Sequence, residues 1–168
     1  MSSPSPLLSP SKNDAVLVRD FTDADRAAFE TFNRAWVEKY FVVEPIDAAL
    51  FSNPRKMILD DGGRIFIAEA DGKAAGACAL KIVDSDTFEL SKMGVGDHYK
   101  GKGIAKLLTR HCIDASRAMG KKRIIIFSNR ILENAIRIYQ SCGFTEIPLT
   151  DEDKEYYQRV NIKLELIL

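Results

Sequence analysis

The fold of this chain is decided by the stretch His98-Tyr99-Lys100-Gly101-Lys102-Gly103-Ile104-Ala105-Lys106-Leu107-Leu108. It places a glycine-rich loop between an apolar run typical of a strand, 87–95, and an amphipathic pattern typical of a helix, 103–119. Two glycines separated by one residue let backbone N–H groups approach one point with no Cβ in the way. The helix that follows adds its unpaired N–H groups and the positive end of its dipole. The stretch therefore predicts an anion site suited to phosphate or pyrophosphate.

The spacing of the glycines distinguishes between known phosphate-binding loops. A Rossmann loop requires a third glycine where this chain has Lys106, and the P-loop string Gly-x-x-x-x-Gly-Lys-Ser/Thr does not occur. The hexapeptide Lys100-Gly101-Lys102-Gly103-Ile104-Ala105 instead resembles the acyl-CoA loop of the GNAT acetyltransferase family, Arg/Gln-x-x-Gly-x-Gly/Ala. Lys100 stands where that family prefers Arg or Gln, a mild departure because the position acts largely through its backbone.

Other segments resemble the same family in the same order. Residues 88–95 are similar to its fourth strand, and 123–129 are similar to its fifth strand. Residues 132–144 are similar to its closing helix, Ala-x-x-Leu-Tyr-x-x-x-Gly-Phe, with Ile138 at the leucine position. The resemblance implies an α/β fold with a mixed, mostly antiparallel sheet of six to seven strands and about four flanking helices. It also implies a splay between the fourth and fifth strands.

The resemblance implies acetyl-CoA as the acyl donor, bound without a metal. The residues that it assigns to the cofactor are the backbone groups of Met93 and Val95 and the loop residues Lys100, Gly101, Lys102, Gly103, Ile104 and Ala105. The family often has an asparagine at the position of Leu132, so Asn129 and Asn134 are the candidates for that polar contact. Gly94 is a candidate for the β-bulge that starts the splay.

Glu89 is the candidate general base. It lies six residues before Val95, the spacing at which the histone-acetylating branch of the family carries its catalytic glutamate. Its neighbours Phe88 and Leu90 favour partial desolvation, which raises the pKa of a carboxyl group. An exposed strand glutamate or a partner for Lys92 is the alternative interpretation. Whether the proton leaves directly or through water stays open.

Tyr139 is the candidate general acid. The resemblance of Ile138-Tyr139 to the family's closing helix implies a hydroxyl near the sulfur of the cofactor. Leu132, Ala135 and Tyr139 also share one helix face, so an ordinary core tyrosine is the alternative.

The remaining sequence predicts a tail and a single domain. Residues 1–14 are rich in Ser and Pro and are expected to be disordered, and 15–168 form the N-acetyltransferase domain. We expect strands at 15–19, 64–70, 73–83, 87–95, 123–127 and 159–166, and helical segments at 22–36, 47–51, 54–59, 103–119 and 132–142. Asp71-Gly72 predicts a tight hairpin turn, and Tyr156 and Tyr157 are expected in a loop.

Composition narrows the function classes. Lys plus Arg and Asp plus Glu both number 24, so no global basic field indicates a nucleic acid or an anionic membrane as partner. Cys78, Cys112 and Cys142 have no Cys-x-x-Cys spacing and are expected to be reduced thiols. His98 and His111 have no partners at metal-ligand spacing. With neither a signal peptide nor a membrane span in the sequence, we expect a cytoplasmic protein.

The sequence therefore predicts an enzyme that transfers the acetyl group of acetyl-CoA to a primary amine by direct attack in a ternary complex. The acceptor is a small molecule or a peptide, bound between the first helices (Trp36, Glu38, Tyr40, Phe41) and the loop of Tyr156 and Tyr157. A non-catalytic acyl-CoA-binding or regulatory module and a nucleotide-binding domain are the alternatives. A homodimer through the sheet edge near the last strand is also left open.

Overall fold

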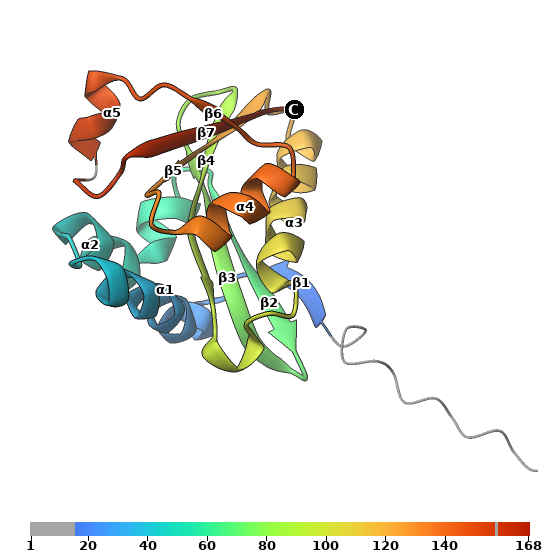
Figure 1. Ribbon diagram of the computed structural model, residues 1–168. Helices are drawn as coiled ribbons and strands as arrows, with labels where there is room; N and C mark the ends of the chain where they lie inside the picture. The colour runs from blue at the N-terminus through green and yellow to red at the C-terminus, as the bar shows by residue number, and fades with distance from the viewer. Residues whose placement is uncertain (1–15, 157) are drawn as a thin grey trace, which may run out of the picture.

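The computed structural model describes residues 16–156 and 158–168, so the predicted tail and Tyr157 lie outside the described residues. In chain order the elements are β1 (Val16–Asp20), η1 (Asp23–Asp25), α1 (Arg26–Tyr40), α2 (Pro45–Ser52), η2 (Arg55–Leu59), β2 (Arg64–Ala70), β3 (Lys73–Ile82), β4 (Thr87–Val95), η3 (Asp97–Tyr99), α3 (Ile104–Ala118), β5 (Arg123–Ser128), α4 (Glu133–Ser141), β6 (Thr145–Ile147), α5 (Asp151–Tyr156) and β7 (Ile162–Ile167). Figure 1 shows their arrangement.

One seven-stranded sheet in the order β1-β2-β3-β4-β5-β7-β6 forms the centre of the molecule. Among the strands of the described residues, only β4 and β5 are parallel, and every other neighbouring pair is antiparallel. Helices cover both faces (Figure 1). The predicted α/β fold with a mixed, mostly antiparallel sheet is therefore confirmed.

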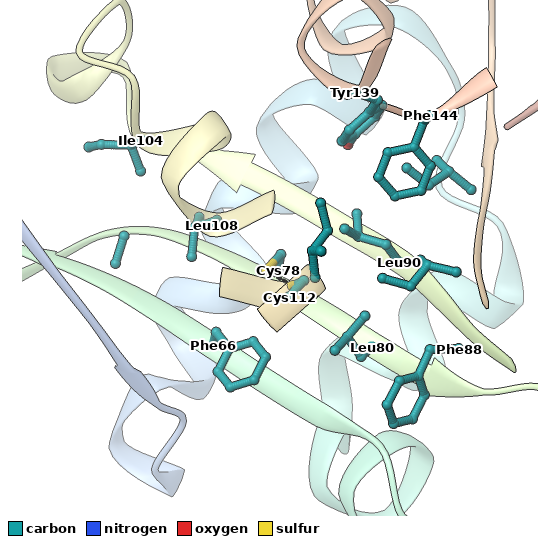
Figure 2. Close-up of a cluster of buried hydrophobic side chains, with 14 of the residues drawn as sticks. Phe66, Cys78, Leu80, Phe88, Leu90, Ile104, Leu108, Cys112, Tyr139 and Phe144 are labelled. Carbon is teal, nitrogen blue, oxygen red and sulfur yellow. Dashed lines mark hydrogen bonds between the residues drawn. The ribbon is translucent and has the colours of Figure 1, made fainter. Parts of the chain in front are cut away.

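Alternating side chains give the sheet two apolar cores. Ile65 and Ile67 of β2 join Phe29 of α1 and Leu50 of α2 on one face. Phe66 of β2 joins the core on the other face, which contains residues of α3 and α4 and is drawn in Figure 2. In that second core the sulfur atoms of Cys78 and Cys112 lie 3.2 Å apart as free thiols, both buried. Cys142, the third free cysteine, is only half-buried.

The sheet opens between β4 and β5, as the sequence predicted. The two strands pair only over Thr87, Phe88 and Glu89. On the opposite side of β4, Ser91 pairs with Ala79 and Gly94 pairs with Ala77, so β4 contains one extra residue between these pairs. A bulge of this kind bends a strand and increases its twist, and it turns β4 away from β5.

The bulge lies at Lys92 and not at Gly94, where the sequence placed it. Lys92 has a positive φ of 54°, which is uncommon for a residue with a Cβ. Gly94 serves a different purpose, because a Cβ at this position would lie 2.8 Å from the carbonyl oxygen of Phe32 in α1. The glycine therefore permits close contact between α1 and β4.

The other predicted elements differ from the structure mainly near the C-terminus. The hairpin turn is confirmed, with φ of 52° at Asp71 and 76° at Gly72. Tyr156 ends helix α5 where a loop was expected, and β7 begins at Ile162 and not at Arg159. The sheet edge near the last strand is β6, which lies outside β7. A dimer through that edge stays a prediction.

Four charged side chains connect the start of α2 with β4 and with the segment before β7. Asp47, which is fully buried, accepts a hydrogen bond from Lys92 Nζ at 2.6 Å and two from the Arg159 guanidinium at 2.7 Å. Glu44 accepts a further bond from Arg159 at 3.1 Å. Burial alone would raise the pKa of Asp47, but its bonds to Arg159 and Lys92 hold that pKa well below its usual range. We call these four residues the charge cluster.

Replacing Asp47 with Asn should destabilise the fold by about 3–5 kcal/mol at pH 7, because Lys92 and Arg159 would keep their buried charges without a full counter-charge. Because the pKa of Asp47 is lowered in the folded state, its carboxylate contributes to the free energy of unfolding above the unfolded-state pKa of about 4. This contribution is lost as the pH falls through the folded-state pKa. The difference in the free energy of unfolding between wild type and Asp47→Asn, measured by urea denaturation, should therefore become smaller below pH 4.

Asp23→Asn is the matched control, since Asp23 forms an exposed ion pair with Arg55. It should change the free energy of unfolding by no more than about 1 kcal/mol. Equal effects of the two substitutions would show that the charge cluster does not stabilise the fold.

Candidate active site

A groove of about 570 Å³ lies between β4, the glycine loop and the start of α4. Its walls include eight of the residues that the sequence assigned to the cofactor: Met93, Val95, Lys100, Gly101, Gly103, Ile104, Ala105 and Asn134. Lys102 is not among them, and its Nζ lies 5.6 Å from the ring centroid of Tyr99. Lys106 lines the groove instead.

The glycine loop has the geometry of an anion site. Gly101 and Gly103 have φ of 76° and 78°, and a Cβ at either position would meet no heavy atom within 4 Å. Gly103 is the N-cap of α3 and has no side chain to cap the first turn. The first N–H groups of α3 and its positive dipole end therefore remain available to an anionic ligand.

A second, smaller cavity of about 130 Å³ lies at the opening between β4 and β5. Its walls are formed by Trp36, Phe41, Glu89, Leu90, Ser91, Lys92, Met93, Ile126, Phe127, Ser128, Asn129, Leu132, Ala135, Tyr139, Arg159 and Val160. Four of these residues, Trp36, Met93, Leu132 and Ala135, also line the groove. The two cavities are therefore neighbours with shared walls, and we call the smaller one the inner cavity.

Glu89 and Tyr139 reach the inner cavity from opposite faces of the sheet. Glu89 pairs with Lys81 on β3, so the two side chains lie on the same face of the sheet. Since side chains alternate along a strand, Lys81 shares its face with Ala79, which belongs to the core under α1 and α2. Tyr139 belongs to α4 and to the core on the other face (Figure 2). The sequence predicted both residues, and the structure brings them to one cavity.

Glu89 is a buried carboxyl group whose surroundings shift its pKa. It is only 4% exposed. Burial raises its pKa, and the charges of Lys81 and Lys92 and a hydrogen bond with Ser91 act in the opposite direction. A raised pKa gives a carboxylate more affinity for a proton, which suits a general base.

Tyr139 is a buried tyrosine that keeps its proton. It is 5% exposed, and its ring contacts Phe144 edge to face with centroids 6.1 Å apart. Burial, with a smaller effect of the thiols of Cys78 and Cys112, raises the pKa of its hydroxyl well above the usual range. The hydroxyl is therefore protonated at neutral pH, and it is a weaker acid than an exposed tyrosine.

Asn129 lines the inner cavity and not the groove. Its side-chain N–H donates to the Arg159 carbonyl at 2.6 Å, and its side-chain oxygen accepts from the Ile131 N–H at 2.9 Å. The observed bonds thus fasten the end of β5 to the segment before β7. Of the four helical residues expected near the acceptor, Trp36 and Phe41 line the inner cavity and Tyr40 lines the groove. Glu38 lines neither and pairs with Arg34.

Sequence reasoning missed Lys92 and Arg159, the two cationic residues in the wall of the inner cavity. For Lys92 the sequence did contain a signal, because a charged residue stands within a strand, 87–95, that was expected to be buried. Arg159 gave no such signal, because its role depends on a contact with Asp47, 112 residues away in sequence.

Within residues 16–156 and 158–168, no group of three or more His, Cys, Asp or Glu side chains is arranged to hold a metal ion. In the same part of the chain, no helix has the length and apolar character needed to cross a membrane.

Residues 23–144 match the sequence profile of the acetyltransferase (GNAT) family, and the chain belongs to that family. An N-acetylaspartate synthetase from Danio rerio is 25% identical over 143 residues, which cover 82% of this chain and 51% of that protein. The chain spans about half the length of that curated relative.

Solved structures show the same fold. A GNAT-family acetyltransferase from Staphylococcus aureus superposes with a TM-score of 0.80 at 18% identity, over 90% of this chain and 98% of that one. The putative acetyltransferase YncA from Salmonella typhimurium, solved with its cofactor acetyl-CoA, superposes with a TM-score of 0.68 at 20% identity, over 90% and 93% of the two chains.

Gly103→Val should abolish acetyl-CoA binding, because a branched Cβ would fill the space from which backbone N–H groups approach the pyrophosphate. Gly120→Val is the matched control at the other end of α3. Gly120 has φ of 74°, and a Cβ there would also meet nothing within 4 Å. Both variants carry similar backbone strain of about 1–2 kcal/mol. Calorimetry that finds equal acetyl-CoA affinity in the two variants would exclude this loop as the cofactor site.

Proposed function

We propose that this protein is an N-acetyltransferase that transfers the acetyl group of acetyl-CoA to a primary amine by direct attack in a ternary complex. The observation that carries the proposal is the meeting of Glu89 and Tyr139 in the inner cavity, which shares walls with the groove of the glycine loop. A donor bound along the groove has its thioester end beside both groups.

The reaction moves three protons, because the ammonium nitrogen loses two on its way to an amide and the thiolate gains one. The ammonium group must lose its first proton before its nitrogen attacks the thioester carbonyl, and Glu89 accepts that proton directly or through water. The N–C bond then forms, the C–S bond breaks, and the Tyr139 hydroxyl donates a proton to the departing thiolate. The second proton lost by the nitrogen restores the tyrosine hydroxyl, so that one proton in total leaves through Glu89. Because both groups line one small cavity, the reactants are positioned before chemistry begins.

The relatives favour an enzyme with an amine acceptor. The N-acetylaspartate synthetase is named for a product in which the amine of an amino acid carries the acetyl group. A non-catalytic acyl-CoA-binding module would have no use for a buried glutamate and a buried tyrosine at the end of the groove. We also keep a cytoplasmic location as part of the proposal, since the three cysteines are free.

The test measures release of CoA thiol from acetyl-CoA in the presence of a panel of amines. We expect release with at least one amine class, and protection in a thermal-shift assay by CoA but not by ATP or NAD. Protection by CoA with no turnover of any amine would favour the binding module. Protection by ATP or NAD alone would favour a nucleotide-binding domain.

Tyr139→Phe should lower turnover by roughly ten- to a thousand-fold, because it removes the hydroxyl that protonates the thiolate and keeps the ring in the core. The affinity for acetyl-CoA should stay nearly unchanged. Tyr99→Phe is the control, since Tyr99 lines the groove but not the inner cavity. If Tyr139→Phe is fully active, Tyr139 is a packing residue only.

Glu89→Gln should lower turnover by about a hundredfold or more, since glutamine cannot accept the proton. Glu89 must be ionised to act, and burial raises its pKa. The rate of the wild type should therefore rise with pH through a value above the ordinary glutamate pKa of about 4.3. In the variant this acidic limb should shift or vanish.

Glu165→Gln is the control for Glu89→Gln, because Glu165 is a strand glutamate paired with Arg123 and lies outside both cavities. It should keep the wild-type pH profile. A Glu89→Gln enzyme with the wild-type rate and profile would show that the proton leaves by another route.

A further inference from the structure

Among the described residues, the charged side chains that line the inner cavity are one acid and two bases: Glu89, Lys92 and Arg159. The carboxylates of Asp47 and Glu44, which bind the two bases, do not line the cavity. The described cavity wall therefore presents one carboxyl group and two cations, and the acids that balance the cations lie outside that wall. The charges match a molecule that carries both an ammonium and a carboxylate group.

Both cations are held in place before any acceptor binds. Arg159 bonds Asp47 through two nitrogen atoms at 2.7 Å, and its guanidinium carbon lies 5.7 Å and 5.9 Å from the ring centroids of Trp36 and Phe41. Its backbone carbonyl accepts the bond from Asn129. Lys92 is fixed by the bulge of β4 and by its bond to Asp47. Preorganised cations bind an anion without the cost of ordering long side chains.

The inner cavity limits the size of what reaches Glu89. Its volume of about 130 Å³ is close to that of an engineered cavity of about 150 Å³ that holds benzene. An acceptor of roughly this size fills the cavity, whose wall contains Glu89 and both cations. A free amino acid with a compact side chain fits this limit.

We propose that the acceptor is a small amino acid, whose ammonium faces Glu89 and whose carboxylate is bound by Arg159 and Lys92. This inference rests on the proposed function and names the acceptor class of the same site. Arg159 and Lys92 are then specificity-determining residues, and the charge cluster serves binding as well as stability.

The test compares each of several small α-amino acids with its own α-amide at equal acetyl-CoA concentration. The amide has nearly the same shape, lacks the negative charge, and has the less basic amine, which is more readily unprotonated. We expect kcat/KM to be roughly 10- to 100-fold higher for the acids, as for loss of a charge-assisted hydrogen bond. Equal or faster turnover of the amides overturns the inference, and so does a peptide that outperforms every free amino acid.

The same panel separates this inference from the proposed function. Turnover of amides and simple amines without preference for acids leaves the N-acetyltransferase in place and removes the carboxylate site. Absence of turnover with acids, amides, simple amines and peptides, while acetyl-CoA still binds, counts against both.

Arg159→Lys provides a second measurement. It keeps the positive charge beside Asp47 but replaces the planar guanidinium, which has five N–H donors, with a single ammonium group. The acid-to-amide ratio of kcat/KM should fall at least about fivefold. Arg123→Lys is the control, because Arg123 is also part-buried and paired with a glutamate but lies outside the inner cavity. An unchanged ratio in a folded Arg159→Lys enzyme would overturn the role of Arg159.

Discussion

The parting of β4 and β5 after Glu89 is the constraint on which the rest of the molecule depends. The parallel pairing lasts for three residues, and the bulge at Lys92 then turns β4 away. A sheet closed at this point would keep the side chains of its two faces apart. Glu89 and Tyr139 belong to different faces and share a cavity because the sheet is open between them. The bulge is therefore as much a part of the candidate site as the two residues to which we assign the chemistry.

An opening in the middle of a sheet removes hydrogen bonds between strands, and the charge cluster fastens one side of that opening. Buried ions stabilise a protein only where each charge is matched and hydrogen-bonded. Here Lys92 and Arg159 face Asp47 and Glu44, so the cations and the acids are equal in number. The match permits two largely buried cations to stand in the wall of the inner cavity. The interactions that hold the opening also set its electrostatic character.

The sequence was sufficient for features that depend on local pattern. The glycine loop, the hairpin at Asp71-Gly72 and both ends of α3 follow from short-range rules, and they were predicted closely. Glu89 and Tyr139, which line one cavity, were proposed because a family resemblance supplied their positions, and their roles stay predictions. Features that depend on distant contacts were missed. The bulge of β4 was predicted at Gly94 because glycine tolerates a bulge. In the structure the bulge lies at Lys92, whose positive φ is accompanied by a buried hydrogen bond to Asp47. Nothing local marked Arg159, whose partners Glu44 and Asp47 precede it by more than 100 residues.

The order of strands has a consequence for how the molecule is completed during synthesis. β6 has β7 as its single neighbour in the sheet, and β7 is the last strand of the chain. β6 must therefore wait for β7 before it gains a partner, and the two join the edge of β5 together. Every described residue that lines the groove lies at or before Ile138, whereas the wall of the inner cavity also includes Arg159 and Val160. A growing chain thus contains the described wall of the groove before it contains the segment that completes the inner cavity.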